Sequence, residues 1–166
     1  ISGIPVPTDG IHGVYVWLQD GAGNSDFRTA SPLPNAFRLD RAAPTSSYGL
    51  SRPPDHGEWY TDTVTVYLYS TDPVPSGANT VSGVAVISYT LDGGPWRTLS
   101  ETGFAVSGEG EHVVSYFAVD HAGNVEITRT ISPRIKIDLN PPFSGISHIG
   151  GQQGAPGWYV TPVQVI

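Results

Sequence analysis

Hydrophobic and polar residues alternate along several short stretches of this chain, with the two-residue period of a β-strand. In Val64–Thr71, every second residue from Val64 to Leu68 is aliphatic, and the residues between them are polar or aromatic. His112–Asp120 shows the same alternation, and Val84–Leu91 is a further predicted strand. Apolar residues do not recur anywhere at the 3.6-residue spacing of an amphipathic helix. The pattern therefore predicts an all-β protein.

Turn residues separate these stretches. Asp92-Gly93-Gly94 is typical of a tight turn, where glycine supplies positive φ, and Pro133 marks an edge or a bulge because it lacks an N–H. The strands expected in one unit are Val64–Thr71, Val84–Leu91, Trp96–Leu99, Phe104–Val106, His112–Asp120, Val125–Thr130 and Arg134–Asp138. About seven short strands separated by turns predict an immunoglobulin-like β-sandwich.

The chain repeats itself with a period of about 99 residues. The matching stretches are Gly3–Asn24 with Gly103–Asn124, Phe37–Pro44 with Ile135–Pro142, and Gly57–Tyr67 with Pro156–Ile166. Because a unit of this length can bury its own core, the repeat predicts tandem immunoglobulin-like domains rather than a solenoid. We expect the C-terminal half of one unit at 1–43, a complete domain at 44–141, and the opening part of a further unit at 142–166.

The two expected joints share a pattern, in which an aspartate shortly precedes proline: Asp40 before Pro44, and Asp138 before Pro141-Pro142. Proline restricts the backbone on both sides of itself. We therefore expect successive units to be held within a limited range of angles.

Composition excludes several classes of function. The net charge is −7 and only eight residues are Lys or Arg, so no basic patch for nucleic acid is expected. The absence of cysteine excludes disulfides, zinc–thiolate sites and thiol catalysis. No apolar run approaches the length of a membrane span. There is no GxSxG motif, and no pair of carboxylates is placed across a cleft, so we expect a protein that is not an enzyme.

Four motifs occur here in one order: GEWYTDTVTVYL, SGVAVISYTLDGGPW, GEGEHVVSYFAVDHAGNVE and IKIDLNPP. In this order they resemble the immunoglobulin-like repeats of bacterial cell-surface and secreted proteins, and the resemblance covers almost the whole chain. It implies a structural or adhesive role outside the cell or at its surface, without a particular ligand. Pro73–Val81 departs from the family pattern, because it lengthens a loop that the family keeps short.

The turn Asp120–Asn124, which recurs at Asp20–Asn24, has two interpretations. The first is structural, since Asp accepts backbone N–H bonds while Gly and Asn tolerate left-handed conformations. The second is a calcium site. In a sandwich of this kind the loops at one end meet the incoming linker, which would gather Asp40, Asp72, Asp120 and Asn124. Calcium takes six to eight oxygen ligands, which carboxylates, Asn and backbone carbonyls supply.

Aromatic and histidine residues also have two interpretations. Trp96, Tyr67 and Tyr69 form a carbohydrate platform if they share an exposed face, and otherwise serve in packing. His12 and His112 occupy equivalent positions without the spacing of a metal site, so we expect half-exposed strand histidines.

These observations predict a structural segment, acting as a stalk, fibre or spacer, of a bacterial extracellular or surface protein. One alternative is an adhesin or carbohydrate-binding module that uses the inserted loop Pro73–Val81 and nearby aromatics. Another is a filament subunit whose half-domains exchange strands, with copies of itself as partners instead of neighbouring repeats. The missing counterpart of Leu68–Thr102 at either end argues against strand exchange.

Overall fold

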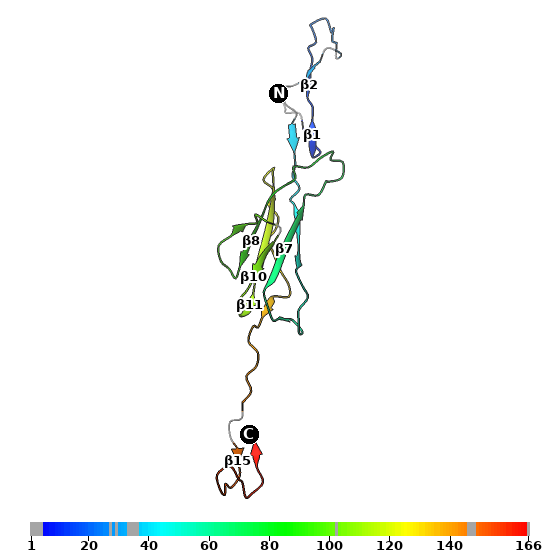
Figure 1. Cartoon of the computed structure of the whole chain (residues 1–166). Helices are drawn as coiled ribbons and strands as arrows, with labels where there is room; N and C mark the ends of the chain where they lie inside the picture. The colour runs from blue at the N-terminus through cyan, green and yellow to red at the C-terminus, as the bar shows by residue number, and fades with distance from the viewer. Residues whose placement is uncertain are drawn as a thin grey trace.

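The computed structural model describes residues 5–26, 28, 30–32, 37–101, 103–145 and 149–165; Gly3 and Ile166 lie outside this set. The described residues form β-strands and no α-helix, so the all-β prediction is confirmed. Among them there is also no helix long and apolar enough to cross a membrane. A central sandwich, which spans residues 45–137, lies between an N-terminal segment (residues 5–41) and a C-terminal segment (residues 149–165) (Figure 1).

Two antiparallel sheets form the layers of the central sandwich. The first has the order β10-β7-β5, with β10 at Gly103–Val106, β7 at Val64–Thr71 and β5 at Thr45–Leu50. The second has the order β13-β12-β8-β9, with β13 at Arg129–Thr130, β12 at Val114–Asp120, β8 at Val84–Leu91 and β9 at Arg97–Thr98. The architecture is an immunoglobulin-like β-sandwich, as the spacing of strands and turns predicts.

A smaller sheet, of order β11-β14-β6, closes the sandwich at its far end. It consists of β11 (Gly110–His112), β14 (Ile135–Ile137) and β6 (Trp59–Tyr60). Strand β14 pairs with β6 in parallel, and Asp138 N–H continues this pairing by donating to the Tyr60 carbonyl at 2.9 Å. The last strand of the sandwich is therefore anchored beside one of its first.

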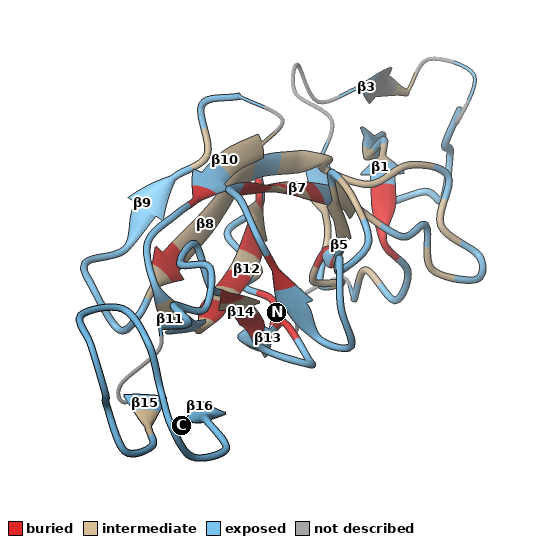
Figure 2. Cartoon of the chain, turned by 60° about the horizontal axis from the view of Figure 1, so that its bottom comes forward, coloured by how far each residue is buried: buried red, intermediate tan, exposed pale blue. Residues whose placement is uncertain are grey.

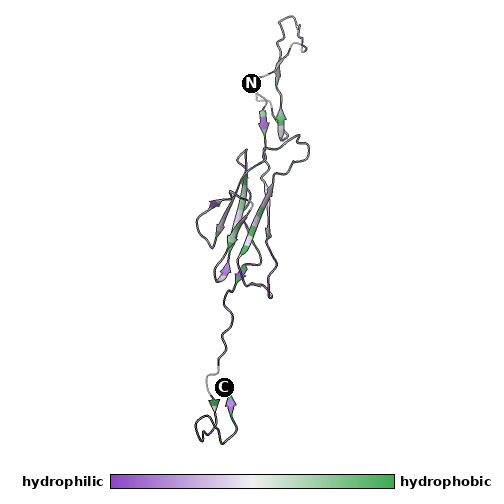
Figure 3. Ribbon diagram, viewed as in Figure 1, coloured by the Kyte–Doolittle hydropathy of each residue, from purple (hydrophilic) through white to green (hydrophobic). Residues whose placement is uncertain are grey.

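The core lies between the two layers and follows the alternation in the sequence. In β7, Val64, Val66 and Leu68 are at most 3 % exposed, and the residues between them are less buried. In β12, Val114, Tyr116 and Ala118 are also at most 3 % exposed. Figure 2 shows buried residues along both β7 and β12. The rest of the core cluster comprises Tyr60, Val106, Ile131, Ile135 and Ile137. Figure 3 shows hydrophobic and hydrophilic residues following one another along these strands. Burial of this apolar surface is the main force that holds the layers together.

Several strand predictions are confirmed and others differ. Val64–Thr71 and Val84–Leu91 are strands with the predicted bounds. The tight turn is present too: Asp92 and Gly93 have φ of 52° and 70°, and Gly94 N–H donates to the Leu91 carbonyl at 2.9 Å.

The predicted single strand His112–Asp120 is instead two strands, β11 and β12, which separate at Val113. The cause is Asp92, whose carboxylate accepts the Val113 N–H at 2.7 Å and contacts His112 Nδ1 at 2.8 Å. The predicted Val125–Thr130 is shorter, because only Arg129–Thr130 forms a strand and Val125 forms a single bridge with Val119. The sequence analysis missed β5 and β6; β5 reads TSSYGL, whose few apolar residues do not show the alternation.

Short strand pairs make up the two outer segments. In the N-terminal segment β1 (Gly10–His12) pairs with β4 (Phe37–Leu39), and β2 (Tyr15–Val16) pairs with β3 (Ser31–Pro32). In the C-terminal segment β15 (Ile149–Gly150) pairs with β16 (Gln164–Val165). Figure 1 places the two segments beyond opposite ends of the central sandwich.

A buried carboxylate, Glu126, ties the two layers together at the end that faces the N-terminal segment. It is 7 % exposed and accepts the N–H of Ser46 in β5 at 2.9 Å and the N–H of Ala118 in β12 at 3.2 Å. The Ser46 hydroxyl donates to it as well, and Arg129 Nε donates at 2.6 Å. Burial opposes ionisation, but these hydrogen bonds outweigh burial and lower the pKa of Glu126.

We predict that Glu126→Gln destabilises the sandwich by about 2–3 kcal/mol, because the amide NH₂ group confronts N–H and O–H donors that need an acceptor. The measurement is the free energy of unfolding in denaturant, and Glu101→Gln, at an exposed position, is the matched control.

A pH series adds a second test of Glu126. Because the folded pKa lies below the ordinary value of 4.5, the contribution of Glu126 is present above that value and disappears as pH falls through the folded pKa. The wild type should therefore lose stability below about pH 4.5 more steeply than Glu126→Gln. Equal slopes for the two proteins would contradict this role.

Candidate functional site at the joint before the central sandwich

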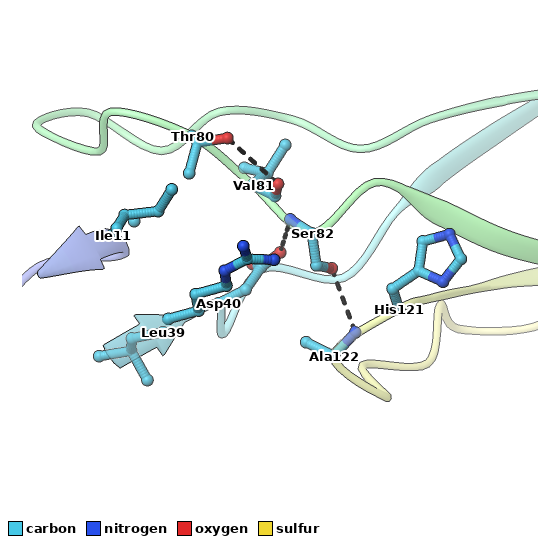
Figure 4. Close-up of a pocket in the computed structure, with 10 residues that line it drawn as sticks. Ile11, Leu39, Asp40, Thr80, Val81, Ser82, His121 and Ala122 are labelled. Atoms are coloured by element: carbon cyan, nitrogen blue, oxygen red, sulfur yellow. Dashed lines mark hydrogen bonds between the residues drawn. The ribbon is translucent and has the colours of Figure 1, made fainter. Parts of the chain in front are cut away.

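Asp40 connects the N-terminal segment to the central sandwich through both its side chain and its backbone. Its Oδ2 accepts the Ser82 N–H at 2.5 Å (Figure 4), and its carbonyl accepts the Asn124 Nδ2 amide at 3.0 Å. Its Oδ1 accepts the N–H of Ala42 at 3.1 Å, which shapes the linker into a local turn. The linker is thus held by two different loops of the sandwich.

The turn at Asp120–Asn124 is the second part of the joint. Asp120 is 3 % exposed, and its two carboxylate oxygens accept the backbone N–H and the Nδ2 of Asn124 at 2.8 and 2.7 Å. Burial opposes ionisation of Asp120, but the hydrogen bonds from Asn124 outweigh it and lower the pKa. Asp20 binds Asn24 in the same way, with both distances at 2.8 Å. The structural interpretation of this motif accounts for the turn in both places.

The inserted loop Pro73–Val81 reaches the N-terminal segment. Asn79 Oδ1 accepts the N–H of Ile11 at 2.9 Å, and Asn79 Nδ2 donates to the carbonyl of Ile11 at 3.2 Å. Gly10 leaves room for this contact: it has φ of +119°, and a Cβ there would lie 2.0 Å from Asn79 Oδ1. From the sequence, this loop is a candidate ligand-binding insertion. In the structure it contacts the neighbouring segment, which the sequence did not predict.

An ion pair fixes the start of the linker. Arg41 Nε donates to Asp9 Oδ1 at 2.8 Å, and Arg41 Nη2 donates to the Pro7 carbonyl at 3.1 Å. Asp9 is 8 % exposed, whereas the Arg41 side chain is more than half exposed. No motif distinguishes Asp9, Arg41 or Asn79 in the sequence, because their roles come from contacts between residues 32 and 68 positions apart.

Three of the four proposed calcium ligands come together at this joint. One carboxylate oxygen each of Asp40, Asp72 and Asp120 lies within 4.8 Å of the other two. Asn124 lies beside them, with its amide nitrogen bonded to Asp120 and to the Asp40 carbonyl. We call Asp40, Asp72 and Asp120 the carboxylate cluster. Its members come from the linker, from the residue after β7 and from the end of β12.

Asp72 is the electrostatically strained member of the carboxylate cluster. Its Oδ2 accepts the Gly83 N–H at 2.7 Å, but its Oδ1 is buried and has no hydrogen-bond partner among the described residues. Burial raises the pKa of Asp72, and the charges of Asp40 and Asp120 raise it further, against the opposing hydrogen bonds from the Gly83 N–H and the Ser82 side chain. A hard divalent cation would supply the missing partner and offset the repulsion.

A cavity of about 370 Å³ adjoins the cluster between the N-terminal segment and the sandwich. Figure 4 shows Asp40 and Ser82 on one side of it and the imidazole of His121 nearby. The Ser82 hydroxyl accepts the Ala122 N–H at 3.2 Å, which connects the inserted loop's end to the Asp120 turn. The cavity is therefore formed by the same residues that make the joint.

The three aromatic residues of the expected carbohydrate platform do not share a face. Trp96 packs edge-on against Phe117, with ring centroids 4.8 Å apart, on the sheet that contains β12. Tyr67 and Tyr69 lie on β7, in the other sheet. A single carbohydrate platform that combines these residues is not formed.

His12 and His112 have matching structural contacts. His12 Nε2 lies 2.8 Å from the Thr8 carbonyl, and His112 Nε2 lies 3.1 Å from the Gly108 carbonyl. Both rings thus help to shape a turn four residues earlier in the chain.

No protein-family model matches this chain, and no curated protein was found to be similar to it. Among solved structures, the PKD1 domain of Vibrio anguillarum Epp is similar, with a TM-score of 0.38 and 18 % sequence identity. The match covers 58 % of this chain and 96 % of that domain. A likeness at this level assigns neither a family nor a function to the chain.

We predict that Gly10→Ala opens the joint, whereas Gly110→Ala does not. Both glycines have positive φ, of +119° and +112°, so both substitutions strain the backbone to a similar extent. Only the Cβ at position 10 would displace Asn79, because no described residue lies within 4 Å of a Cβ at position 110.

The chain lacks cysteine, so Phe37→Cys and Thr98→Cys introduce a single pair of spin-label sites across the joint. The width of the distance distribution between them is the measurement for the two glycine variants. Equal broadening in both variants would show that the Asn79 contact does not hold the joint.

Proposed function

We propose that this chain is a segment of a tandem immunoglobulin-like array in a bacterial extracellular or surface protein, and that it acts as a stiff spacer. The observation that carries this proposal is the joint itself. The linker residue Asp40 is bonded to Ser82 and Asn124 of the sandwich. Independently, Asn79 of the inserted loop forms two hydrogen bonds with the backbone of Ile11 in the preceding segment.

Matching geometry on both sides of the joint supports the tandem array. Strand β1 pairs with β4 in the register Gly10 with Leu39, and β11 pairs with β14 in the register Gly110 with Ile137. The turn before Trp59 recurs before Trp158, each closed by a tryptophan N–H bond of 2.9 Å. Because the outer segments extend beyond opposite ends of the sandwich, successive units would follow one another end to end (Figure 1).

The extracellular or surface location in this proposal comes from the sequence resemblance to repeats of exported proteins. The two alternative functions have less support. The Asn79 side chain faces the joint instead of a ligand, and the aromatics of a carbohydrate platform lie on different sheets. For strand exchange, the specific support is the exposure of Val163 and Val165, whose counterparts Val64 and Val66 form the core.

We predict that Asp40→Ala loosens the joint, because the Ser82 N–H loses its carboxylate acceptor. Loss of about 1–2 kcal/mol corresponds to a rise of about 5- to 30-fold in the population of other joint geometries. The measurement is the distance distribution between spin labels at positions 37 and 98. Asp62→Ala is the control, because Asp62 is exposed and, among the described residues, its side chain accepts a hydrogen bond from the adjacent Thr63 N–H alone. A wild-type distribution as broad as that of Asp40→Ala would contradict the spacer function.

We also propose that the carboxylate cluster binds calcium and so stiffens the joint. The three carboxylates offer oxygen ligands of the kind calcium prefers. The buried, unpartnered Oδ1 of Asp72 is the feature that a purely structural turn does not explain.

The calcium proposal predicts that Asp72→Asn changes thermal stability in opposite directions in the presence of a chelator and in the presence of calcium. In chelator, the variant should be more stable than the wild type, because the substitution removes charge repulsion and supplies donors. With calcium at about ten times its Kd, the wild type should gain about 1.4 kcal/mol, and the variant should gain none. Thermal unfolding of both proteins in calcium and in chelator measures this, with Asp62→Asn as the control. A wild-type melting temperature that is the same in both would exclude the site.

A further inference from the structure

Asp138 repeats the position and the local geometry of Asp40 at the other end of the central sandwich. Asp40 directly follows β4, and Asp138 directly follows β14, a strand paired in the same register. Each aspartate accepts the N–H of the residue two positions later: Asp40 Oδ1 from Ala42 at 3.1 Å, and Asp138 Oδ1 from Asn140 at 3.0 Å. The two linkers therefore begin with the same turn.

An acidic side chain holds the start of both linkers as well. Asp9 accepts Arg41 Nε at 2.8 Å, and at the equivalent position Glu109 accepts the Leu139 N–H at 2.9 Å. Asn140 Nδ2 also donates to Glu109. The N-terminal segment and the central sandwich each fix the start of their own outgoing linker through an acidic side chain.

The two aspartates differ in the hydrogen bonds that their Oδ2 atoms accept. Asp40 Oδ2 accepts the Ser82 N–H, whereas Asp138 is exposed and its Oδ2 accepts no hydrogen bond from the described residues. The strand edge beside it is equally open. Gly110 has a positive φ, as Gly10 has. A Cβ at Gly10 would collide with Asn79, whereas no described residue lies within 4 Å of a Cβ at Gly110.

We propose that Asp138 and the edge at Gly110–Glu111 form a docking surface for a second sandwich of the same type, following in the array. This rests on the proposed spacer function and names the partner of the second joint. The chemistry selects that partner. A free carboxylate oxygen accepts from a backbone N–H such as that of Ser82, and an open strand edge bonds a carboxamide such as that of Asn79.

A chain with a duplicated sandwich tests this proposal: residues 1–141 followed by residues 44–166. The design keeps the native spacing, because Asp138-Leu139-Asn140-Pro141 then precedes Pro44 as Asp40-Arg41-Ala42-Ala43 does in the natural chain. Both joints then meet sandwiches of identical sequence. Cysteine in place of Thr98 in both copies gives one spin-label pair across the second joint.

We expect a narrow distance distribution across the second joint. Asp138→Ala should raise the population outside the main peak about fivefold, the factor expected for loss of one hydrogen bond. Asp62→Ala in the second copy is the control and should leave the distribution unchanged. Asn79→Ala in the second copy should broaden it, while Ser76→Ala, at an exposed position of the same loop, should not.

A second joint that is broad, or that is narrow but unaffected by Asp138→Ala, would overturn the proposal. The pair at positions 37 and 98 of the natural chain separates this outcome from failure of the spacer function, since the first joint would then still be narrow. Calorimetry shows whether both sandwiches fold, because two sandwiches absorb about twice the heat of one. If the first copy of the sandwich, which follows Asp40, folds and the second copy, which follows Asp138, does not, the two joints are not equivalent and the proposal is overturned.

Discussion

The central sandwich depends on one buried carboxylate that joins its two layers where hydrogen bonds between strands cannot. Strands within a sheet are joined by their backbone ladders, but β5 and β12 belong to different sheets and share no ladder. Glu126 bridges them by accepting backbone N–H groups from Ser46 and Ala118 at once. A buried charge is costly unless it is fully hydrogen-bonded, so this arrangement fixes the relative position of the layers as well as stabilising them. The position of the first strand, and therefore the direction in which the linker arrives, follows from it.

At the joint with the N-terminal segment, carboxylates again accept hydrogen bonds from backbone N–H groups, here those of loops. Asp120 organises the turn that ends at Asn124, and Asp40 joins that turn to the Ser82 loop. Asp72 adds a third charge, whose Oδ2 accepts the Gly83 N–H and whose Oδ1 has no hydrogen-bond partner among the described residues. Hydrogen bonds alone account for Asp40 and Asp120. They do not account for a third carboxylate in a partly buried site, where burial first, and then repulsion from Asp40 and Asp120, raises its pKa. This imbalance is the physical reason to propose a cation.

Local patterns in the sequence determined how much could be predicted. The alternation in Val64–Thr71 and the glycines after Asp92 act within a few residues, so β7 and the tight turn could be recognised directly. Strand β5 could not, because it is an edge strand whose position depends on pairing with β7 and on Glu126 instead of on its own apolar residues. The meeting of Asp40, Asp72 and Asp120 was predictable because the topology of the sandwich brings those loops to one end. The hydrogen bonds between Asn79 and Ile11 could not be predicted, because they require a particular conformation of a loop that lies 68 residues away in the sequence.

The inserted loop determines what kind of joint this is. A linker held only by Asp40 is fixed at one point, and the segment before it remains free to swing about that point. Asn79 adds a second point on β1, and the ion pair between Asp9 and Arg41 adds a third within the segment itself. Each contact alone is worth at most about 1–2 kcal/mol. Contacts at two separate points restrict rotation more than either contact alone, because a swing about Asp40 must break the Asn79 contact, while the ion pair keeps the linker fixed to the segment. In the proposed spacer, stiffness at this joint is therefore a consequence of geometry, and the inserted loop Pro73–Val81 is the element that supplies it.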